Sequence, residues 1–373
     1  MLPESPESHP AAYSLYIHVP WCLKKCPYCD FNSHEARTGI PEADYLAALR
    51  RDFDAARPRL ANHRIETVFI GGGTPSLLSA AAVGEMLNAL PQPAEEVTLE
   101  ANPGAIEAAK FAAFRAAGVS RLSLGIQSFD DAKLKALGRI HSADEAKRAV
   151  DMALRHFGRV NLDLMYGLPR QTLAEARRDI ETAIAFGAGH LSAYHLTIEP
   201  NTAFHHAPPD LPDDDLAADM QAMVEETLAA ADYAHYEVSA FAKPDEQCQH
   251  NLNYWRFGDY LGIGAGAHSK IDGQREARSR HPQDYLADPV TRTWQPIAAA
   301  DLAGEFMMNA LRLTDGFDAA LFEQRAGLPL AAIEPALRQA ESEGLITRAN
   351  GRIAPTLLGQ RFLNRLIGLF LSS

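Results

Sequence analysis

The chain has 373 residues, 47% of them hydrophobic, and a formal net charge of −13 from 35 Lys and Arg against 48 Asp and Glu. This acidic balance argues against a nucleic-acid partner bound through its phosphates. No apolar run reaches the roughly 18 residues that a membrane span needs, and the N-terminal residues do not resemble a secretion signal. With only four cysteines, three of them grouped, we expect a cytoplasmic protein whose thiols bind metal or take part in redox chemistry.

Short apolar segments alternate with longer amphipathic segments in the first half of the chain. The predicted strands are residues 15–19, 67–70, 96–101, 121–126, 160–166 and 190–196. Helical patterns lie between them, for example at 42–60, 79–90, 108–118 and 144–158, and Gly118 and Gly158 are expected to end two of these helices. Six consecutive β–α units predict a parallel sheet with right-handed crossovers. Because the alternation stops after the sixth strand, we predict an α/β fold with a partial (β/α)6 barrel of the TIM type.

The pattern changes after residue 200. A connector rich in proline and acid (199–215) leads to a helix (216–233), a strand (235–243) and a hairpin that turns at Asp272-Gly273. From about 298 the chain is mainly helical. Its last part has the order helix, two short strands joined by Asn350-Gly351, and helix, which resembles a winged helix.

The predicted domains are therefore a barrel core (1–200), a region of connector, strand and hairpin (201–297), and a mainly helical C-terminal domain (298–373). For the winged helix we expect an architectural role rather than DNA binding, given the acidic charge of the chain. The final segment, 360–373, is strongly apolar, so we expect it to pack on the small domain. Peripheral contact with a membrane or a partner protein is the alternative for that segment.

Unusual residues follow several of the predicted strands. Active sites of such barrels form at the C-terminal ends of the strands, where these residues would meet. They are the cysteine loop after the first strand, "GGGTPS" (71–76) after the second, Glu100, Gln127 and Asp163 at the next three, and Tyr194 with His195 at the sixth. One shared pocket is therefore expected.

Cys22, Cys26 and Cys29 have the spacing C-x3-C-x2-C, for which three interpretations exist. Unreactive core cysteines are seldom grouped in this way. A closed zinc site needs four ligands, so His18 or His34 would have to complete the set. A [4Fe–4S] cluster held by three thiolates keeps its fourth iron open to another ligand, and three cysteines are then sufficient. We favour the cluster.

The segment "CLKKCPYC", with Tyr28 as its aromatic residue, resembles the cluster-binding motif of the radical S-adenosylmethionine (SAM) superfamily. The resemblance implies that SAM chelates the open iron through its amino and carboxylate groups. It also implies that reduction, by a donor such as a flavodoxin or ferredoxin, cleaves SAM to a deoxyadenosyl radical. The superfamily uses a partial (β/α)6 barrel. "GGGTPS" resembles its glycine motif for the methionine end of SAM, where glycines would expose backbone N–H groups to the ligand carboxylate.

Further segments resemble the oxygen-independent coproporphyrinogen III oxidase family. These are "SLYIHVPWC", "LEANPG", "SLGIQSF", "LGRIHS" and "NLDLMYGLP". The resemblance implies SAM contacts at Tyr16, Gly72, Gly73, Thr74, Glu100, Gln127, Arg139 and Asp163. Arg139 is suited to binding a carboxylate in bidentate fashion, and Glu100 to pairing with an ammonium or ribose hydroxyls. The alternative is that these residues have a structural role only, since a carboxylate at a strand end often caps the next helix.

The chain departs from the oxidase at Phe31, where the oxidase carries a fourth cysteine two positions after the third. This loss, together with "HNLNYW" (250–255), resembles the HemW branch of heme chaperones. The resemblance implies a protein that binds heme through His250, Tyr254 and Trp255 and passes it to an acceptor apoprotein. It does not favour an active oxidase. Decarboxylation of coproporphyrinogen III in porphyrin biosynthesis is kept as the alternative function.

The residues of this motif allow a second interpretation without heme. Imidazole is a common iron ligand and aromatic rings pack on macrocycles. In the structural alternative, His250 is a hydrogen-bonded histidine within an aromatic core. Cys248 is a further candidate heme ligand, although a lone cysteine is more often buried and inert. His205 and His206 lie in the acidic connector, where we expect them to face solvent.

Overall fold

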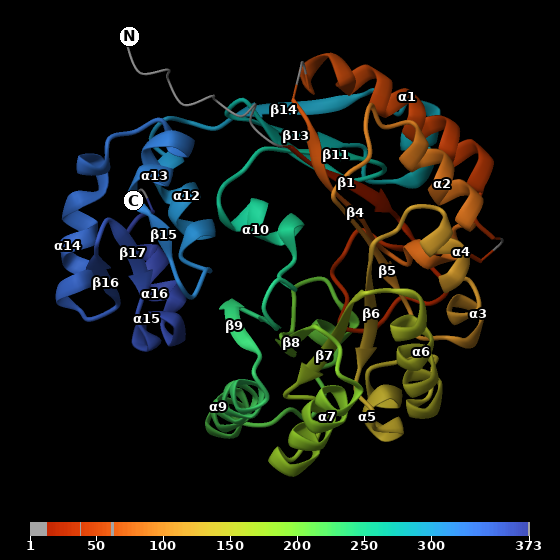
Figure 1. Ribbon diagram of the computed structural model, residues 1–373, viewed down its shortest axis with the longest axis horizontal. Helices are drawn as coiled ribbons and strands as arrows, with labels where there is room; N and C mark the ends of the chain where they lie inside the picture. The colour runs from red at the N-terminus through yellow and green to blue at the C-terminus, as the bar shows by residue number, and fades with distance from the viewer. Residues whose placement is uncertain (1–12, 38, 61–62, 372–373) are drawn as a thin grey trace, which may run out of the picture.

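The computed structural model describes residues 13–37, 39–60 and 63–371. Its largest feature is a twelve-stranded sheet that curves into an open barrel, with helices on its outer face (Figure 1). All six predicted strands are present and pair in parallel, in chain order. They are β1 (Tyr13–Val19), β4 (Ile65–Gly72), β5 (Glu96–Ala101), β6 (Arg121–Gln127), β7 (Arg159–Tyr166) and β8 (His190–His195). The predicted partial barrel is confirmed.

The outer helices follow the predicted alternation. They are α1 (Glu42–Leu60), α2 (Ala80–Asn88), α3 (Ala105–Ala108), α4 (Phe111–Ala116), α5 (Asp131–Ala136), α6 (Ala143–His156) and α7 (Leu173–Phe186). The prediction of a single helix at 108–118 is wrong, because the helical hydrogen bonding is interrupted between α3 and α4. At the break, the Lys110 ammonium donates to the carbonyls of Ser76 and Leu77, 3.0 and 3.3 Å away.

Of the two glycines expected to end helices, only Gly118 has a positive φ. Gly118 follows α4 with φ +109°, a conformation that glycine adopts without strain. Gly158 is not in the left-handed region, so that prediction is wrong: Phe157 ends α6 in an extended conformation.

Strands from beyond residue 200 extend the sheet at both edges. β11 (Tyr260–Ile263) pairs in parallel with β1, and β12 (His268–Ile271), β13 (Gln274–Arg278) and β14 (Arg292–Pro296) continue from it in antiparallel order. The predicted hairpin turn is confirmed, with Asp272 at φ +52° and Gly273 at φ +71°. The other edge carries β10 (Ala240–Ala242) and β9 (Ala234–Glu237). The sheet therefore continues across residue 200.

The single strand predicted at 235–243 is wrong. The segment folds back on itself, so that Phe241 pairs with His235 in the β9–β10 hairpin. At the turn the Glu237 carboxylate accepts the N–H of Ser239 at 3.2 Å. Helix α9 (Asp214–Ala230) packs on β9. The other helices of this region are α8 (Ala203–His206), beside the cysteine loop, and α11 (Pro282–Ala287), which packs on α1. His205 and His206 are exposed, as expected.

Helix α10 (Gln249–Trp255) lies at the centre of Figure 1, against the inner side of the parallel strands. The buried Glu96 carboxylate holds its first turn by accepting the N–H groups of Gln249 at 3.1 Å and His250 at 3.0 Å. Burial acts to raise the pKa of Glu96, but Arg121, Arg159 and these N–H groups together keep it below its usual value. An ionised carboxylate therefore anchors α10 inside the barrel.

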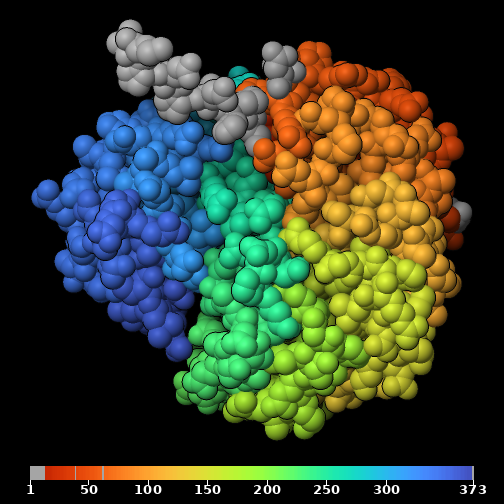
Figure 2. All heavy atoms as spheres, in the orientation of Figure 1, coloured from red at the N-terminus to blue at the C-terminus, as the bar shows by residue number. Residues whose placement is uncertain are grey.

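The C-terminal residues form a lobe beside the barrel (Figure 2, blue). Its elements are α12 (Leu302–Ala310), β15 (Phe317–Asp318), α13 (Ala319–Ala326), α14 (Glu334–Ser342), β16 (Ile346–Ala349), β17 (Arg352–Pro355), α15 (Leu357–Arg361) and α16 (Leu363–Gly368). The predicted order of helix, two strands and helix is confirmed, with Asn350 and Gly351 at positive φ in the turn. Phe306, Phe317 and Phe322 are fully buried in its separate core.

The apolar C-terminal segment packs mainly inward. Leu366, Ile367 and Phe370 belong to the core of the C-terminal lobe, as expected, whereas Phe362 is 57% exposed. Within the described part of the chain, no helix combines the length and apolar character that crossing a bilayer requires.

The anchoring of α10 gives a stability prediction. Glu96→Ala should lower the free energy of unfolding by about 3–5 kcal/mol, because it removes the partner of Arg159 (2.7 Å), a charge that stabilises the buried Arg121, and the acceptor of two N–H groups. The neighbouring Glu95 forms only an exposed ion pair with Arg64, at 3.1 Å, so Glu95→Ala should cost less than about 1 kcal/mol. Urea unfolding followed by circular dichroism compares the two. Equal losses would contradict the anchoring role.

Candidate radical SAM site

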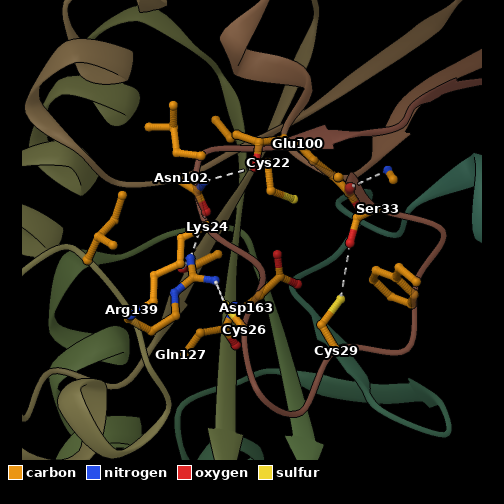
Figure 3. Close-up of a pocket in the computed structure, with 18 of the residues that line it drawn as sticks. Cys22, Lys24, Cys26, Cys29, Ser33, Glu100, Asn102, Gln127, Arg139 and Asp163 are labelled. Atoms are coloured by element: carbon orange, nitrogen blue, oxygen red, sulfur yellow. Dashed lines mark hydrogen bonds between the residues drawn. The ribbon is translucent and has the colours of Figure 1, made fainter. Parts of the chain in front are cut away.

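The predicted pocket exists at the C-terminal ends of the barrel strands. It is a cavity of about 310 Å³ into which the labelled side chains of Figure 3 point. Eleven predicted residues line it: Cys22, Cys26, Tyr28, Cys29, Gly72, Gly73, Thr74, Glu100, Gln127, Arg139 and Asp163. Tyr194 also lines it, whereas the ring of His195 packs on Tyr166 at 5.4 Å and lies outside the lining. We call this space the cluster cavity.

The cysteine loop connects two short strands that pair in parallel, β2 (Trp21–Cys22) and β3 (His34–Glu35). The Lys25 ammonium fixes the loop from inside, donating to the carbonyls of Phe31 at 3.1 Å and Ser33 at 3.3 Å. Local hydrogen bonds therefore give the loop its shape, and all three thiols line the cavity.

Donor groups surround the thiols. Arg139 Nη1 donates to Cys26 Sγ at 3.5 Å, and Ser33 Oγ lies 3.9 Å from Cys29 Sγ. Burial raises the pKa of Cys22 and of Cys29, and hydrogen bonds from Thr74 to Cys22 and from Ser33 to both thiols oppose this. Such donors stabilise thiolates, the form that ligates iron.

The thiols do not converge on one point. Among the residues that the structure describes, no group of three or more His, Cys, Asp or Glu side chains is arranged to hold a single metal ion. A zinc site would need such convergence. In a [4Fe–4S] cubane each thiolate ligates a different iron, so three thiols spread around one cavity fit that cofactor.

Arg139 connects three strand ends across the cluster cavity. Its Nη2 donates to Asn102 Oδ1 at 2.7 Å and to the Gly125 carbonyl at 2.9 Å, and Asn102 Nδ2 donates to Thr74 Oγ1 at 3.2 Å. The guanidinium is therefore held in position beside Cys26. Sequence reasoning did not select Asn102, although it stands within the "LEANPG" segment.

The glycine motif differs from the expectation in one respect. Its N–H groups are not free: Gly72 donates to Glu100 Oε2 at 3.1 Å, Gly73 to the Val19 carbonyl at 2.7 Å, and Thr74 to the Trp21 carbonyl at 2.7 Å. A Cβ on Gly73 would collide with the Trp21 backbone, and Gly72 has φ +113°. The glycines thus allow the β1–β2 connection to approach β4 closely.

Two carboxyl groups, Glu100 and Asp163, line the cavity, and in the described residues neither forms a direct ion pair, although the charge of Arg121 acts on Asp163. Burial, and secondarily the charge of Asp163, raises the pKa of Glu100 to about 8. Burial also raises the pKa of Asp163, against the hydrogen bonds from Ser123 Oγ and Asn161 Nδ2, both at 2.8 Å. Such a pair favours a ligand that brings positive charge.

The residues expected to bind heme do not line the cluster cavity. His250 is 1% exposed, and both its ring nitrogens are engaged, Nδ1 with Thr67 Oγ1 at 2.9 Å and Nε2 with the Tyr254 hydroxyl at 3.1 Å. Trp255 points elsewhere, with the Arg312 guanidinium 5.3 Å from its ring centroid. Cys248 is fully buried, and burial raises its thiol pKa to about 12. The geometry of His250 therefore matches the structural alternative.

A second cavity of about 460 Å³ adjoins the first. We call it the side cavity, and its lining includes Tyr16, His18, Phe31, Tyr254, Tyr260, His268 and Arg280. The two cavities share Phe31, Gly72 and Glu100. Tyr16 thus lies in the side cavity, and His268 and Arg280 were not selected from the sequence because no motif marks them.

Comparison with known proteins agrees with this site. Residues 16–183 match the family model of the radical SAM superfamily, and residues 297–362 match that of the HemN C-terminal domain. The heme chaperone HemW of Escherichia coli K12 is 47% identical, over 96% of this chain and 98% of that protein. The chain belongs to the HemW family. The HemW protein of Mycobacterium tuberculosis H37Rv is 36% identical, over 95% of each chain.

Proteins with other names are also similar to this chain. The mouse mitochondrial protein named radical S-adenosyl methionine domain-containing protein 1 is 42% identical, over 84% of this chain and 76% of that protein. The solved structure of coproporphyrinogen III oxidase (HemN) from Escherichia coli superposes with a TM-score of 0.83, over 97% of this chain and 91% of that one. At 22% identity this match shows the shared fold. Membership of the radical SAM superfamily implies a [4Fe–4S] cluster and SAM as cofactors.

The positions of the four cysteines predict which thiols ligate the cluster. After anaerobic reconstitution, the protein should contain about four iron and four sulfide per chain and show thiolate-to-iron charge-transfer absorption. Cys22→Ser, Cys26→Ser and Cys29→Ser should each lose most of this signal, whereas Cys248→Ala should retain it because that thiol is buried elsewhere. A wild-type protein that binds zinc and no iron would refute the cluster.

The raised pKa of Glu100 predicts a pH-dependent stability in the absence of SAM. Between pH 4.5 and 8 the folded state retains the Glu100 proton that the unfolded state has lost, so the free energy of unfolding falls as pH rises. Relative to Glu100→Gln, the wild type should lose at most about 1.4 kcal/mol per pH unit in this window. Urea unfolding at several pH values measures the difference. A difference between the wild type and Glu100→Gln that stays constant across these pH values would disprove the shift.

Proposed function

We propose that this protein is a heme chaperone, which binds heme and transfers it to an acceptor apoprotein while carrying a [4Fe–4S] cluster and SAM. The observation that carries the proposal is the 47% identity, over nearly the whole of both chains, to a protein named heme chaperone HemW. Phe31 supports it, since the position where the oxidase family has a fourth cysteine carries a phenyl ring that is 60% exposed at the cavity mouth.

The residues of the cluster cavity are assigned to the two resident cofactors. Cys22, Cys26 and Cys29 would hold the cluster. Tyr28, Gly72, Gly73, Thr74, Glu100, Gln127, Arg139 and Asp163 would surround SAM, with Tyr16 on the side-cavity wall. The bound pair supplies reductive cleavage of SAM. In this arrangement Glu100 and Asp163 would accept a cationic group, and Arg139 would place its positive charge beside the cluster and a ligand carboxylate while it keeps its bonds to Asn102 and Gly125.

An electron donor would reach the cluster loop from outside. Two lysines of this loop, Lys24 and Lys25, are exposed, beside the exposed acids Asp30 and Glu35. A flavodoxin or ferredoxin is the kind of donor that this proposal requires. Peripheral membrane contact is a proposal for the apolar C-terminal segment, in which Phe362 and Leu371 are exposed.

The alternative function is oxidative decarboxylation of coproporphyrinogen III. The shared HemN-like fold permits it, and the missing thiol at Phe31 disfavours it. Activity assays with coproporphyrinogen III, SAM and a reductant distinguish the two functions. Under the chaperone proposal no decarboxylated product forms.

The direct test is heme binding and transfer by the full-length, cluster-containing protein. Titration with heme under anaerobic conditions should produce a Soret band that saturates near one heme per chain. Transfer to candidate apoprotein acceptors should then depend on acceptor concentration and exceed spontaneous release, which apomyoglobin measures as a passive scavenger. Absence of heme binding, or formation of decarboxylated porphyrin, would overturn the proposal.

A further inference from the structure

The side cavity has the chemical character of a site for an iron porphyrin. Aromatic side chains form much of its wall: Phe31, Tyr16, Tyr254 and Tyr260. The rings of Tyr254 and Tyr260 meet edge to face, with centroids 4.6 Å apart. Flat apolar walls with hydroxyl groups at their edges suit a large planar macrocycle.

Two imidazoles line this cavity, and their surroundings differ. His18 is buried, and both its ring nitrogens are engaged, Nδ1 with the Tyr16 hydroxyl at 3.1 Å and Nε2 with the Asn32 carbonyl at 2.8 Å. His268 is exposed at the start of β12, and in the described residues neither of its ring nitrogens forms a hydrogen bond. His268 is thus available for a metal.

The charge around His268 favours its ligand-competent form. Burial, followed by Arg275, Arg280 and Arg278, lowers the pKa of His268. Arg280 lines the same cavity and is exposed, and it forms no ion pair with an acidic side chain in the described parts of the chain. Its guanidinium is free to pair with a carboxylate of a ligand.

The H-N-x-x-Y-W motif reaches this cavity through one residue. Of His250, Tyr254 and Trp255, only Tyr254 is in the lining. For His250 to ligate iron, a side chain that is 1% exposed would have to leave both its hydrogen bonds and the barrel interior. The motif therefore shapes the cavity wall, and the metal ligand has to come from another element.

We propose that heme binds in the side cavity, with His268 as an axial ligand of its iron, Arg280 paired with a propionate, and Tyr254 packed against the macrocycle. This inference rests on the proposed function, because it locates the heme that a chaperone would carry. It assigns His250 a positioning role: through its hydrogen bond to the Tyr254 hydroxyl, His250 holds the cavity wall in place.

The test is anaerobic heme titration of the reconstituted full-length protein and its variants, with resonance Raman and electron paramagnetic resonance spectra of the bound heme. His268→Ala should remove the histidine-ligated signature and weaken heme binding by at least about tenfold. Arg280→Ala should weaken binding about three- to tenfold with the ligation signature unchanged. His206→Ala, an exposed histidine outside the cavity lining, is the matched control and should match the wild type.

Cluster content and SAM binding measured on the same samples show that each variant is folded. If His268→Ala and Arg280→Ala bind heme with wild-type affinity and spectra, the proposed location is wrong, although the chaperone function still stands. Loss of histidine ligation in a folded His250→Ala variant, with His268→Ala unaffected, would also overturn it. If wild-type protein binds no heme, the proposed function itself fails.

Discussion

The interior of this incomplete barrel is filled in part by the short helix α10, and the buried carboxylate of Glu96 holds that helix in place. Glu96 lies in β5 with 1% of its surface exposed, yet it remains ionised because guanidinium groups and the first N–H groups of α10 satisfy it. An unpaired charge at this depth would cost several kcal/mol. The short helix α10 is thereby held against the inner side of the strands.

The position of α10 determines how the H-N-x-x-Y-W segment is used. Hydrogen bonds run from Ser14 through Thr67 and His250 to Tyr254, at 2.7, 2.9 and 3.1 Å. This chain of hydrogen bonds links β1, β4 and α10 and gives each of its four side chains a partner. Its last member, the Tyr254 hydroxyl, reaches the side cavity. In this structure His250 therefore supports the wall of the side cavity through the Tyr254 hydroxyl.

The parts of the fold that the sequence predicts are those set by local rules. Runs of buried apolar residues identify β1 and β4–β8, and the Asp272-Gly273 and Asn350-Gly351 pairs identify two turns, because both residues of each pair adopt positive φ. The addition of β11 beside β1 depends on pairing between residues about 245 positions apart, such as Ser14 and Tyr260, which no local pattern encodes. The fold-back at 235–243 depends on the same long-range sheet.

In the candidate site, too, some features follow from local sequence patterns and others from contacts between distant segments. Cysteine spacing and strand-end carboxylates bring eleven predicted residues to one cavity, because parallel strands present their C-terminal ends on one side. The role of the glycine motif could not be predicted in the same way. The N–H groups of Gly73 and Thr74 donate to backbone carbonyls, and Gly73 has to be glycine because the Trp21 backbone packs against it. That contact is between segments about 50 residues apart, so no local pattern encodes it. His268 and Arg280 come from the added strands, so no periodicity places them near β1.

Phe31 links the two cavities. The cysteine loop that lines the cluster cavity turns so that this ring also lines the side cavity, and Gly72 and Glu100 belong to both walls as well. A ligand that brings positive charge to the cluster cavity favours ionisation of Glu100, whose pKa of about 8 otherwise keeps it largely protonated at pH 7. This places a charge on the wall of the neighbouring cavity. Any resulting effect of one ligand on the other is reciprocal, since linkage requires equal coupling free energies in both directions. Phe31 thus gives the two cavities a shared apolar wall beside a cluster loop that carries three thiols.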